Sequence, residues 1–228
     1  MLKTLLATYK LKGFFNTVKE VFSILYWKYR NYMDYERFDK KYGVETLKIE
    51  KDYLDGLPAT DIESCEFYQA TIWRRFSKSI ECLPSESAGF TFIDLGSGKG
   101  RALMYAALKG FNKIIGVELS NHLNQIARSN LEQFKKRQNK NYKIELISVD
   151  ANQYLLPDEN LVIFMYNPFT GKTMQKVVEN IQQWVTNYNK VFYIIYMNPA
   201  CPKYLEQAKG IVSLHANDGF TIFSGKAK

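Results

Sequence analysis

Residues 90–100 spell FTFIDLGSGKG, an apolar run that ends in an aspartate followed by three alternating glycines. The run Phe90–Leu95 has the composition of a buried strand, and Gly100–Lys109 has the composition of a helix. A glycine-rich turn between a strand and a helix lets the backbone approach a ligand closely, and the first helical turn supplies unpaired amide donors. The stretch therefore predicts a strand–turn–helix unit that binds a ligand at the turn.

Strand and helix patterns alternate along the rest of the chain. Further strands are expected at Lys113–Val117, Lys143–Val149, Leu161–Tyr166 and Val191–Met197, with a helix capped by Ser120 and another at Lys172–Asn187 between them. The strand at 161–166 lacks polar alternation, so both of its faces should be buried. Helical crossovers of this kind join parallel strands, so the pattern predicts an α/β fold with a doubly wound, mostly parallel, Rossmann-like sheet.

The C-terminal residues show a different pattern. Ile211–His215 and Phe220–Phe223 are short apolar runs on either side of the turn sequence Asn217–Asp218–Gly219. Two strands joined by such a turn form an antiparallel hairpin. The hairpin brings the expected sheet to seven strands.

The N-terminal residues form a separate stretch of sequence. The clearest linker is Pro84–Gly89 (PSESAG). The sequence before it has a helical pattern and many aromatic residues, with breaks at Tyr42–Gly43 and Asp55–Pro58. Two units are therefore expected, an N-terminal helical extension over residues 1–83 and the Rossmann-like domain over residues 84–228.

Composition excludes several protein classes. The 228 residues are 46% hydrophobic and 15% aromatic, which fits one sizeable domain with an extension and excludes a disordered chain or a disulfide-stapled mini-protein. Cys65, Cys82 and Cys201 have no Cys-x-x-Cys spacing, which indicates reduced, mostly buried thiols and no metal site. The N-terminal apolar runs are too short for a secretory signal or a membrane span, so a cytoplasmic location is expected.

Two basic segments account for much of the formal net charge of +8. Residues 1–30 contain six basic residues and one acid, Glu20, with apolar residues at helical spacing. A helix that packs on its own domain is favoured for this segment, and peripheral contact with a membrane surface or an anionic partner is the alternative. The second segment, Lys135–Lys140, is most simply a cationic helix end, with nucleic acid or an acidic protein surface as the alternative partner.

The turn after the first strand is compatible with three binding motifs to different degrees. A phosphate-binding P-loop requires glycine where Ile93 stands and a hydroxyl where Gly100 stands, and a dinucleotide fingerprint requires glycine where Arg101 stands. The third pattern, D-x-G-x-G-x-G, is matched at every defined position by residues 94–100. It resembles motif one of the class I, seven-β-strand, S-adenosylmethionine-dependent methyltransferases. The resemblance implies S-adenosylmethionine as the cofactor, held by Asp94, Gly96, Ser97, Gly98 and Gly100.

Acids at the ends of the next two strands support this resemblance. Glu118 ends the second strand, and a carboxylate there can accept hydrogen bonds from both ribose hydroxyls, as it does in NAD enzymes too. Asp150 ends the third strand and precedes Ala151, and in the resembled family an acid at this place commonly holds the adenine amino group. Either acid taken singly is equally typical of a helix cap.

The end of the fourth strand narrows the resemblance. Amino-directed methylases of nucleic acid carry [DN]-P-P-[YF] there, whereas this chain has Asn167–Pro168–Phe169–Thr170, without the second proline. The non-SET, seven-strand histone lysine methyltransferases carry an asparagine followed two residues later by phenylalanine, as Asn167 and Phe169 are. They also carry a Tyr-x-x-Thr that closes over the cofactor, similar to Tyr68–Thr71, which would make the extension a cofactor lid.

The resemblance implies methyl transfer to an amine, with protein lysine as the favoured acceptor. Asn167 would orient the amine and contact the cofactor, while Phe169 and Tyr68 would line the acceptor channel. An RNA or DNA methyltransferase and a non-catalytic cofactor-binding protein are the alternatives. The resemblance covers roughly residues 60–225 and does not extend to residues 1–58.

Overall fold

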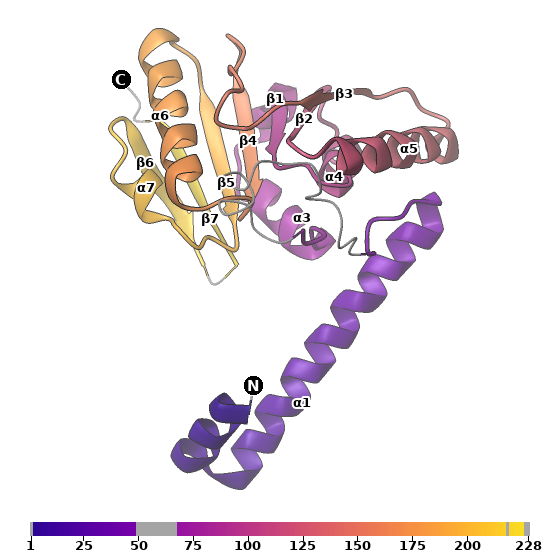
Figure 1. Ribbon diagram of the computed structural model, residues 1–228, viewed down its shortest axis with the longest axis vertical. Helices are drawn as coiled ribbons and strands as arrows, with labels where there is room; N and C mark the ends of the chain where they lie inside the picture. Colours follow the sequence, from indigo (N-terminus) through magenta and orange to yellow (C-terminus); the bar gives the residue numbers. More distant parts are fainter. Residues whose placement is uncertain (1, 49–67, 218, 226–228) are drawn as a thin grey trace.

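The computed structural model describes residues 2–48, 68–217 and 219–225, and a seven-stranded sheet forms its centre (Figure 1). The strands are β1 (Thr91–Leu95), β2 (Lys113–Glu118), β3 (Lys143–Ser148), β4 (Leu161–Tyr166), β5 (Phe192–Met197), β6 (Ile211–Ala216) and β7 (Phe220–Gly225). The helices are α1 (Leu2–Tyr42), α3 (Trp73–Glu81), the 3-10 helix η1 (Ser85–Gly89), α4 (Arg101–Leu108), α5 (Asn121–Gln138), α6 (Gly171–Asn187) and α7 (Lys203–Glu206).

The sheet is mixed and mostly parallel. Its strand order is β3-β2-β1-β4-β5-β7-β6, with β1 to β5 paired in parallel and β7 antiparallel to both β5 and β6. The direction of winding reverses between β1 and β4, and ligands of such sheets bind outside the carboxyl ends of the strands at this reversal. The doubly wound sheet and the terminal hairpin are therefore as predicted.

Two hydrophobic cores cover the two faces of the sheet. Phe92 of β1 belongs to the core shared with α3, α4 and α5, and the next residue, Ile93, belongs to the core shared with α6 and α7. The same alternation runs along β4, in which every residue except Tyr166 is buried. This burial on both faces is what the unbroken apolar run predicted.

Local signals also placed the helices correctly. The side-chain oxygen of Ser120 accepts a hydrogen bond from the Leu123 N–H at 3.3 Å and so caps α5. The basic residues Lys135, Lys136 and Arg137 occupy the last turn of that helix, as expected for a cationic helix end. The expected linker Pro84–Gly89 contains the 3-10 helix η1. The sequence did not predict this helix, because five residues are too few to show helical periodicity.

The last turns of α1 pack on the domain. Phe38 and Tyr42 are buried, and their rings lie 4.8 Å from Tyr105 and 5.0 Å from Phe134, respectively, between ring centroids. The helix ends at Tyr42, and Gly43 takes a φ of +67° where the sequence predicts a break. Since these rings share a core with the sheet, the end of α1 and the domain after residue 84 form one hydrophobic unit.

The rest of α1 does not pack in this way. Figure 1 shows the helix projecting away from the sheet, and the side chains of Phe22, Leu25 and Tyr29 are 57–67% exposed. The expectation that the basic N-terminal helix packs along its own domain is therefore wrong for this stretch. Side chains in α1 are described from Val18 onward, apart from those at 20, 27 and 28, and the expected break at 55–58 lies outside the described residues.

The two described cysteines are free thiols that differ in exposure. Cys82 is exposed and Cys201 half-buried, both are free, and Cys65 lies outside the described residues. The expectation of mostly buried thiols is thus wrong for Cys82, which follows directly after α3. In the described part of the chain, no helix is long and apolar enough to cross a membrane, and no group of three or more His, Cys, Asp or Glu side chains could hold a metal ion.

The shared core predicts a large effect of truncating Phe76 on α3. Its ring is fully buried against Phe92, Phe164 and Tyr105, at centroid distances of 5.3–5.9 Å. We expect Phe76→Ala to lower the free energy of unfolding by about 3–5 kcal/mol in urea denaturation. Leu155→Ala, at a side chain 85% exposed, should change it by less than about 0.5 kcal/mol. Equal effects of the two substitutions would show that α3 is peripheral.

Candidate functional site

The turn between β1 and α4 is closed by contacts that only glycine permits. Gly96 and Gly98 have φ values of +86° and +51°, in the region that disfavours side chains. A Cβ on Gly96 would lie 2.4 Å from the Pro168 Cβ atom, and one on Gly98 would lie 2.5 Å from the Tyr68 ring. The glycine loop is thus in close contact with the end of β4 on one side and with Tyr68 on the other.

Glu118 is oriented by the same loop. One carboxylate oxygen accepts a hydrogen bond from the Gly98 N–H at 2.8 Å, and the other accepts one from the Ser120 N–H at 2.9 Å. Burial raises the pKa of Glu118, and the backbone donors, Ser120 first, oppose that rise. Each oxygen has a further lone pair, so the side chain offers two acceptor positions in a fixed orientation to a ligand.

Asp94 is a second buried acid beside the loop. Its side chain lies at the carboxyl end of β1 and is 3% exposed. Burial, and then the charge of Glu118, raise the pKa of Asp94 well above its ordinary value. A buried carboxyl beside a second acid is costly to the fold, and such groups gather where a ligand supplies an opposite charge.

Ser97 adds an unsatisfied polar atom to the loop. Its hydroxyl is buried and, with Oδ1 of Asn124, is one of two buried side-chain polar atoms without a hydrogen-bond partner among the described residues. The hydroxyl lies over β2, where a Cβ on Gly116 would come within 2.8 Å of it. The predicted loop residues, including Gly100 at the start of α4, therefore lie together with Glu118 in one cradle.

Asp150 and Ala151 follow β3 at the neighbouring strand end. The two oxygens of Asp150 accept hydrogen bonds from the Asn152 N–H at 3.0 Å and from the Asn152 side-chain amide at 2.8 Å. The carboxylate thus caps its own turn, which is the structural role that the sequence left open. Both Asp150 and Ala151 are partly exposed, so a ligand can still reach them.

The end of β4 only partly matches its predicted role. Pro168 touches Gly96, but Oδ1 of Asn167 accepts hydrogen bonds from the Tyr196 hydroxyl at 3.2 Å and the Ala200 N–H at 3.4 Å. Asn167 has a φ of +43°, and this backbone turn directs its amide toward β5. Phe169 is 5% exposed and belongs to the core shared with α6, so it packs inside the domain rather than along an open surface.

Tyr68 and Thr71 come from the segment before α3. The Tyr68 ring covers Gly98, and its hydroxyl donates a hydrogen bond to the Thr46 carbonyl at 2.8 Å. Burial raises the pKa of Tyr68 further above its ordinary value, so the hydroxyl stays protonated at neutral pH. Thr71 is buried just before the helix begins. Of the two, Tyr68 is thus the one with a direct contact to the glycine loop.

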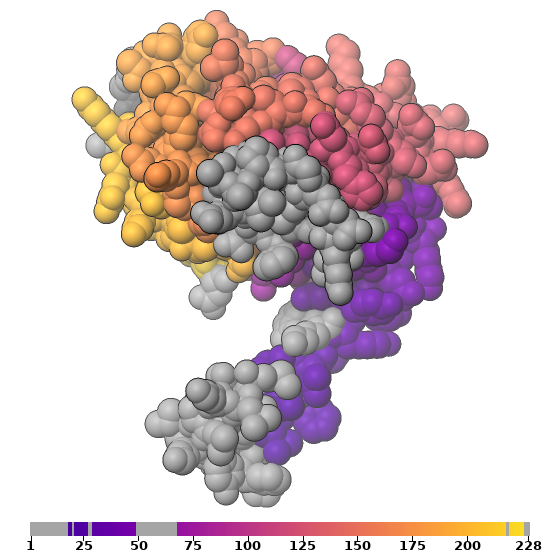
Figure 2. Space-filling view, in the orientation of Figure 1, coloured from indigo at the N-terminus to yellow at the C-terminus, as the bar shows by residue number. Residues whose placement is uncertain are grey.

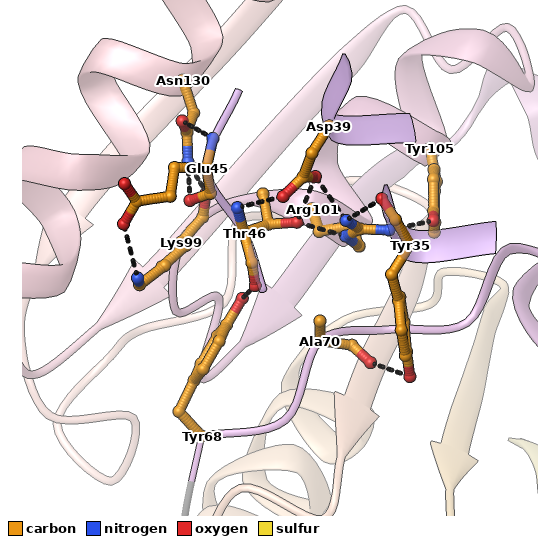
Figure 3. Close-up of polar contacts among 10 residues, drawn as sticks. All are labelled: Tyr35, Asp39, Glu45, Thr46, Tyr68, Ala70, Lys99, Arg101, Tyr105 and Asn130. Carbon is orange, nitrogen blue, oxygen red and sulfur yellow. Dashed lines mark hydrogen bonds and ion pairs between the residues drawn. The ribbon is translucent and has the colours of Figure 1, made fainter. Parts of the chain in front are cut away.

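A strap of residues 43–48, which the sequence did not single out, lies across the back of the loop (Figure 3). Asn130 of α5 holds it from one side, since its amide accepts from the Glu45 N–H at 2.8 Å and donates to the carbonyls of Glu45 and Lys99 at 3.0 and 3.1 Å. Lys99 is fully buried, and its ammonium donates to the Lys48 carbonyl at 2.7 Å. The strap thus bonds directly to the side chain of Lys99, and Asn130 bridges the strap to the Lys99 backbone.

Arg101 joins the strap to α1 and α4. Its guanidinium, 2% exposed, donates to the Thr46 hydroxyl, to the Asp39 carboxylate, to the Tyr35 carbonyl at 3.1 Å and to the Tyr105 hydroxyl at 2.9 Å (Figure 3). The sequence contains one signal for this cluster. Two basic residues, Lys99 and Arg101, flank Gly100 in a turn that the fold must bury. Their partners in α1 and the strap lie more than fifty residues away, so the sequence could not name them.

A surface cavity of about 450 Å³ opens beside the carboxyl ends of β4 and β5. Tyr166 and Asn198, at those two strand ends, form one wall. The other lining residues come from α1, the strap and the segment around α3: Asn31, Tyr32, Tyr35, Leu47, Gln69, Ile72 and Arg75. Phenols, amides, one guanidinium and two apolar side chains thus surround a space beside Tyr166, the residue before Asn167.

Comparison with solved structures places the fold among methyltransferases. A candidate RNA methyltransferase from Pyrococcus horikoshii is 18% identical, with 82% of this chain and 95% of that chain covered and a TM-score of 0.51. A candidate methyltransferase from Escherichia coli is 13% identical, with 80% and 92% covered and a TM-score of 0.51. At such identities the likeness shows the fold alone. No curated protein sequence matches the chain.

The sheet order, the glycine loop and the oriented Glu118 define a class I methyltransferase. Residues 77–194, just over half of the chain, match the family described as histone methylation protein DOT1, and the chain belongs to that family. The protein is thus a methyltransferase of the non-SET type, and its family and fold imply S-adenosylmethionine as the cofactor. The unpaired Ser97 hydroxyl and the cradle around Gly96 and Gly98 fit such a ligand.

The buried state of Asp94 predicts that it destabilises the free protein. Because its pKa is raised on folding, the folded chain binds its proton more tightly than the unfolded chain, and stability falls as pH rises from the ordinary carboxyl pKa toward neutral. Asp94→Asn should therefore raise the free energy of unfolding at pH 7 and flatten its pH dependence, as measured by urea denaturation at several pH values. Asp150→Asn is the control at a partly exposed acid. A less stable Asp94→Asn protein at pH 7 would show that the charge serves the fold.

Proposed function

We propose that the protein transfers a methyl group from S-adenosylmethionine to an amine, with a protein lysine as the favoured acceptor. The observation that carries the cofactor half of this proposal is the Glu118 carboxylate, held by the Gly98 and Ser120 amides beside the glycine loop. The description of the family as a histone methylation protein favours a protein lysine as the methyl acceptor.

The cradle supplies contacts of complementary chemistry for each part of the cofactor. Glu118 would accept from the two ribose hydroxyls, Asp150 from the adenine amino group, and Asp94 from the ammonium of the methionine part. Tyr68, held through its hydroxyl by the strap, would cover the loop. The residues proposed to contact the cofactor are Tyr68, Thr71, Asp94, Gly96, Ser97, Gly98, Gly100, Glu118, Asp150, Ala151 and Asn167.

The bound cofactor supplies a methyl group already activated on a sulfonium, so the protein's task is to align the acceptor. The nitrogen must lie near 3 Å from the methyl carbon and in line with its bond to sulfur. The acceptor would enter through the cavity beside Tyr166 and Asn198, whose lining includes Gln69, the residue after Tyr68. Its guanidinium, on Arg75, disfavours a protonated amine, and a neutral amine is the form that attacks. Burial raises the pKa of Tyr35 and Tyr166, so both stay protonated as hydrogen-bonding walls.

A nucleic acid is the second candidate acceptor. The basic residues Lys135, Lys136 and Arg137 form the last turn of α5, and the formal net charge of the chain is +8. A field of this sign attracts phosphate backbones, and the resulting affinity falls steeply with salt. Salt-dependent retention of the protein on RNA, together with label in RNA, would favour this candidate.

Incubation with methyl-labelled cofactor and a fractionated lysate tests the proposal. Label in protein that survives nuclease treatment and appears on lysine after hydrolysis is the expected result. Label in RNA or DNA would replace lysine with a nucleic-acid acceptor. The absence of transfer to any fraction, with cofactor binding intact, would leave a protein that binds the cofactor without catalysis.

Loss of the Glu118 carboxylate should weaken cofactor binding. Glu118→Ala removes an acceptor for two hydroxyl donors, and we expect a loss of about 1.5–3 kcal/mol in the calorimetric binding free energy, with little change in melting temperature. Glu132→Ala, at an exposed acid on α5, is the matched control. A collapse in melting temperature with unchanged affinity would instead assign Glu118 to the fold.

Asn167 is the residue proposed to be closest to the reacting amine. Asn167→Ala should lower kcat by about a hundredfold, by analogy with the loss of one preorganised polar contact, while cofactor affinity stays within a few-fold. Because Tyr196 and Ala200 already hold its Oδ1, Tyr196→Phe tests whether that orientation matters, and a smaller loss of kcat is expected. Normal turnover by Asn167→Ala would move the acceptor site to Tyr68 and Thr71.

A further inference from the structure

The exposed part of α1 presents a continuous apolar stripe. Phe22, Leu25, Tyr29 and Tyr32 are 67%, 57%, 64% and 53% exposed. Their spacing of three and four residues places them on one face of the helix. Figure 2 shows this part of the chain, in indigo, running away from the body of the molecule, so no part of the described domain covers the face.

Basic residues border the stripe. At 100° per residue, Lys19 and Arg30 fall along one edge of it. The first 33 residues contain six basic residues and one acid, Glu20. An aromatic stripe bordered by cations in such a basic segment is the pattern of a helix that lies in the plane of an anionic lipid surface, with its rings in the interface and its cations among the headgroups.

Charge favours a lipid surface over a second copy of the chain as the partner of this stripe. The positions Val18, Phe22, Leu25, Tyr29 and Tyr32 repeat with the heptad spacing of a coiled coil. Residues 1–30, however, contain six basic residues and one acid, so each copy carries a strongly positive segment. Two copies would therefore bring like charges together, whereas anionic headgroups would neutralise them.

We propose that α1 docks the protein on an anionic lipid bilayer through Phe22, Leu25, Tyr29 and Tyr32. Tyr32 also lines the surface cavity beside β4, together with Asn31 and Tyr35 from the same helix. Docking therefore brings the entrance of that cavity to the bilayer surface, where it meets acceptors carried by membrane-associated molecules. The docking does not rest on the proposed acceptor chemistry, because Phe22, Leu25 and Tyr29 line neither that cavity nor the cofactor cradle.

Vesicle sedimentation of the full chain tests the proposal. The protein should sediment with vesicles of an equal mixture of phosphatidylcholine and phosphatidylglycerol, remain in solution with phosphatidylcholine alone, and be released by salt. The double variant F22S/L25S should bind the anionic vesicles at least about tenfold more weakly. Lys19→Gln should weaken binding about fivefold.

Control variants distinguish a loss of vesicle binding from a loss of folding. L155S and L214S replace apolar side chains that are 85% and 56% exposed elsewhere, and both should bind vesicles like the unaltered chain. All variants should keep their far-ultraviolet circular dichroism and melting temperature, because the replaced side chains are exposed. The proposal would be overturned if the protein bound both vesicle types equally. It would also be overturned if F22S/L25S bound anionic vesicles as well as the control variants do. A dimer in sedimentation equilibrium that F22S/L25S dissolves would assign the stripe to a second copy instead.

Discussion

The site depends on the close approach of two strand ends. β1 and β4 lie side by side at the point where the winding of the sheet reverses, and the Pro168 ring after β4 leaves no room for a side chain on Gly96 after β1. The chain must therefore leave β1 through a left-handed glycine turn. That turn points the Gly98 N–H at Glu118 and buries Asp94 and Ser97 beside it. The cradle is thus a consequence of how two parallel strands can end next to each other.

A second constraint comes from outside the region that matches the family, residues 77–194. The strap at 43–48 and the end of α1 hold Lys99 and Arg101, two buried cations next to the loop. Buried ion pairs such as Arg101–Asp39 add little net stability, because desolvation offsets most of the attraction, whereas removing one partner is costly. The role of these ion pairs here is geometric. The strap that they hold accepts a hydrogen bond from the Tyr68 hydroxyl through the Thr46 carbonyl, and so keeps the Tyr68 ring over Gly98.

Local chemistry in the sequence was enough to predict most of the fold and the meeting of the glycine loop with Glu118. The unbroken apolar run of β4 predicted burial on both faces, and Ser120 predicted a cap, because each signal lies within a few residues of its effect. The direction of the Asn167 amide and the burial of Phe169 could not be predicted, since both depend on β5 and α6. The same holds for Arg101, whose partners are distant in sequence, and for the exposed stripe of α1, because periodicity reports an apolar face without saying what covers it.

The central claim is that the glycine loop and Glu118 form a site for S-adenosylmethionine rather than for a dinucleotide. Glu118 alone does not distinguish the two, because both ligands carry a ribose, so direct binding must decide between them. Isothermal titration calorimetry of the full chain with S-adenosylmethionine and, separately, with NADH makes the distinction. The expected result is saturable binding of S-adenosylmethionine at a single site and no measurable binding of NADH. Comparable affinity for NADH, or no binding of S-adenosylmethionine, would contradict the claim.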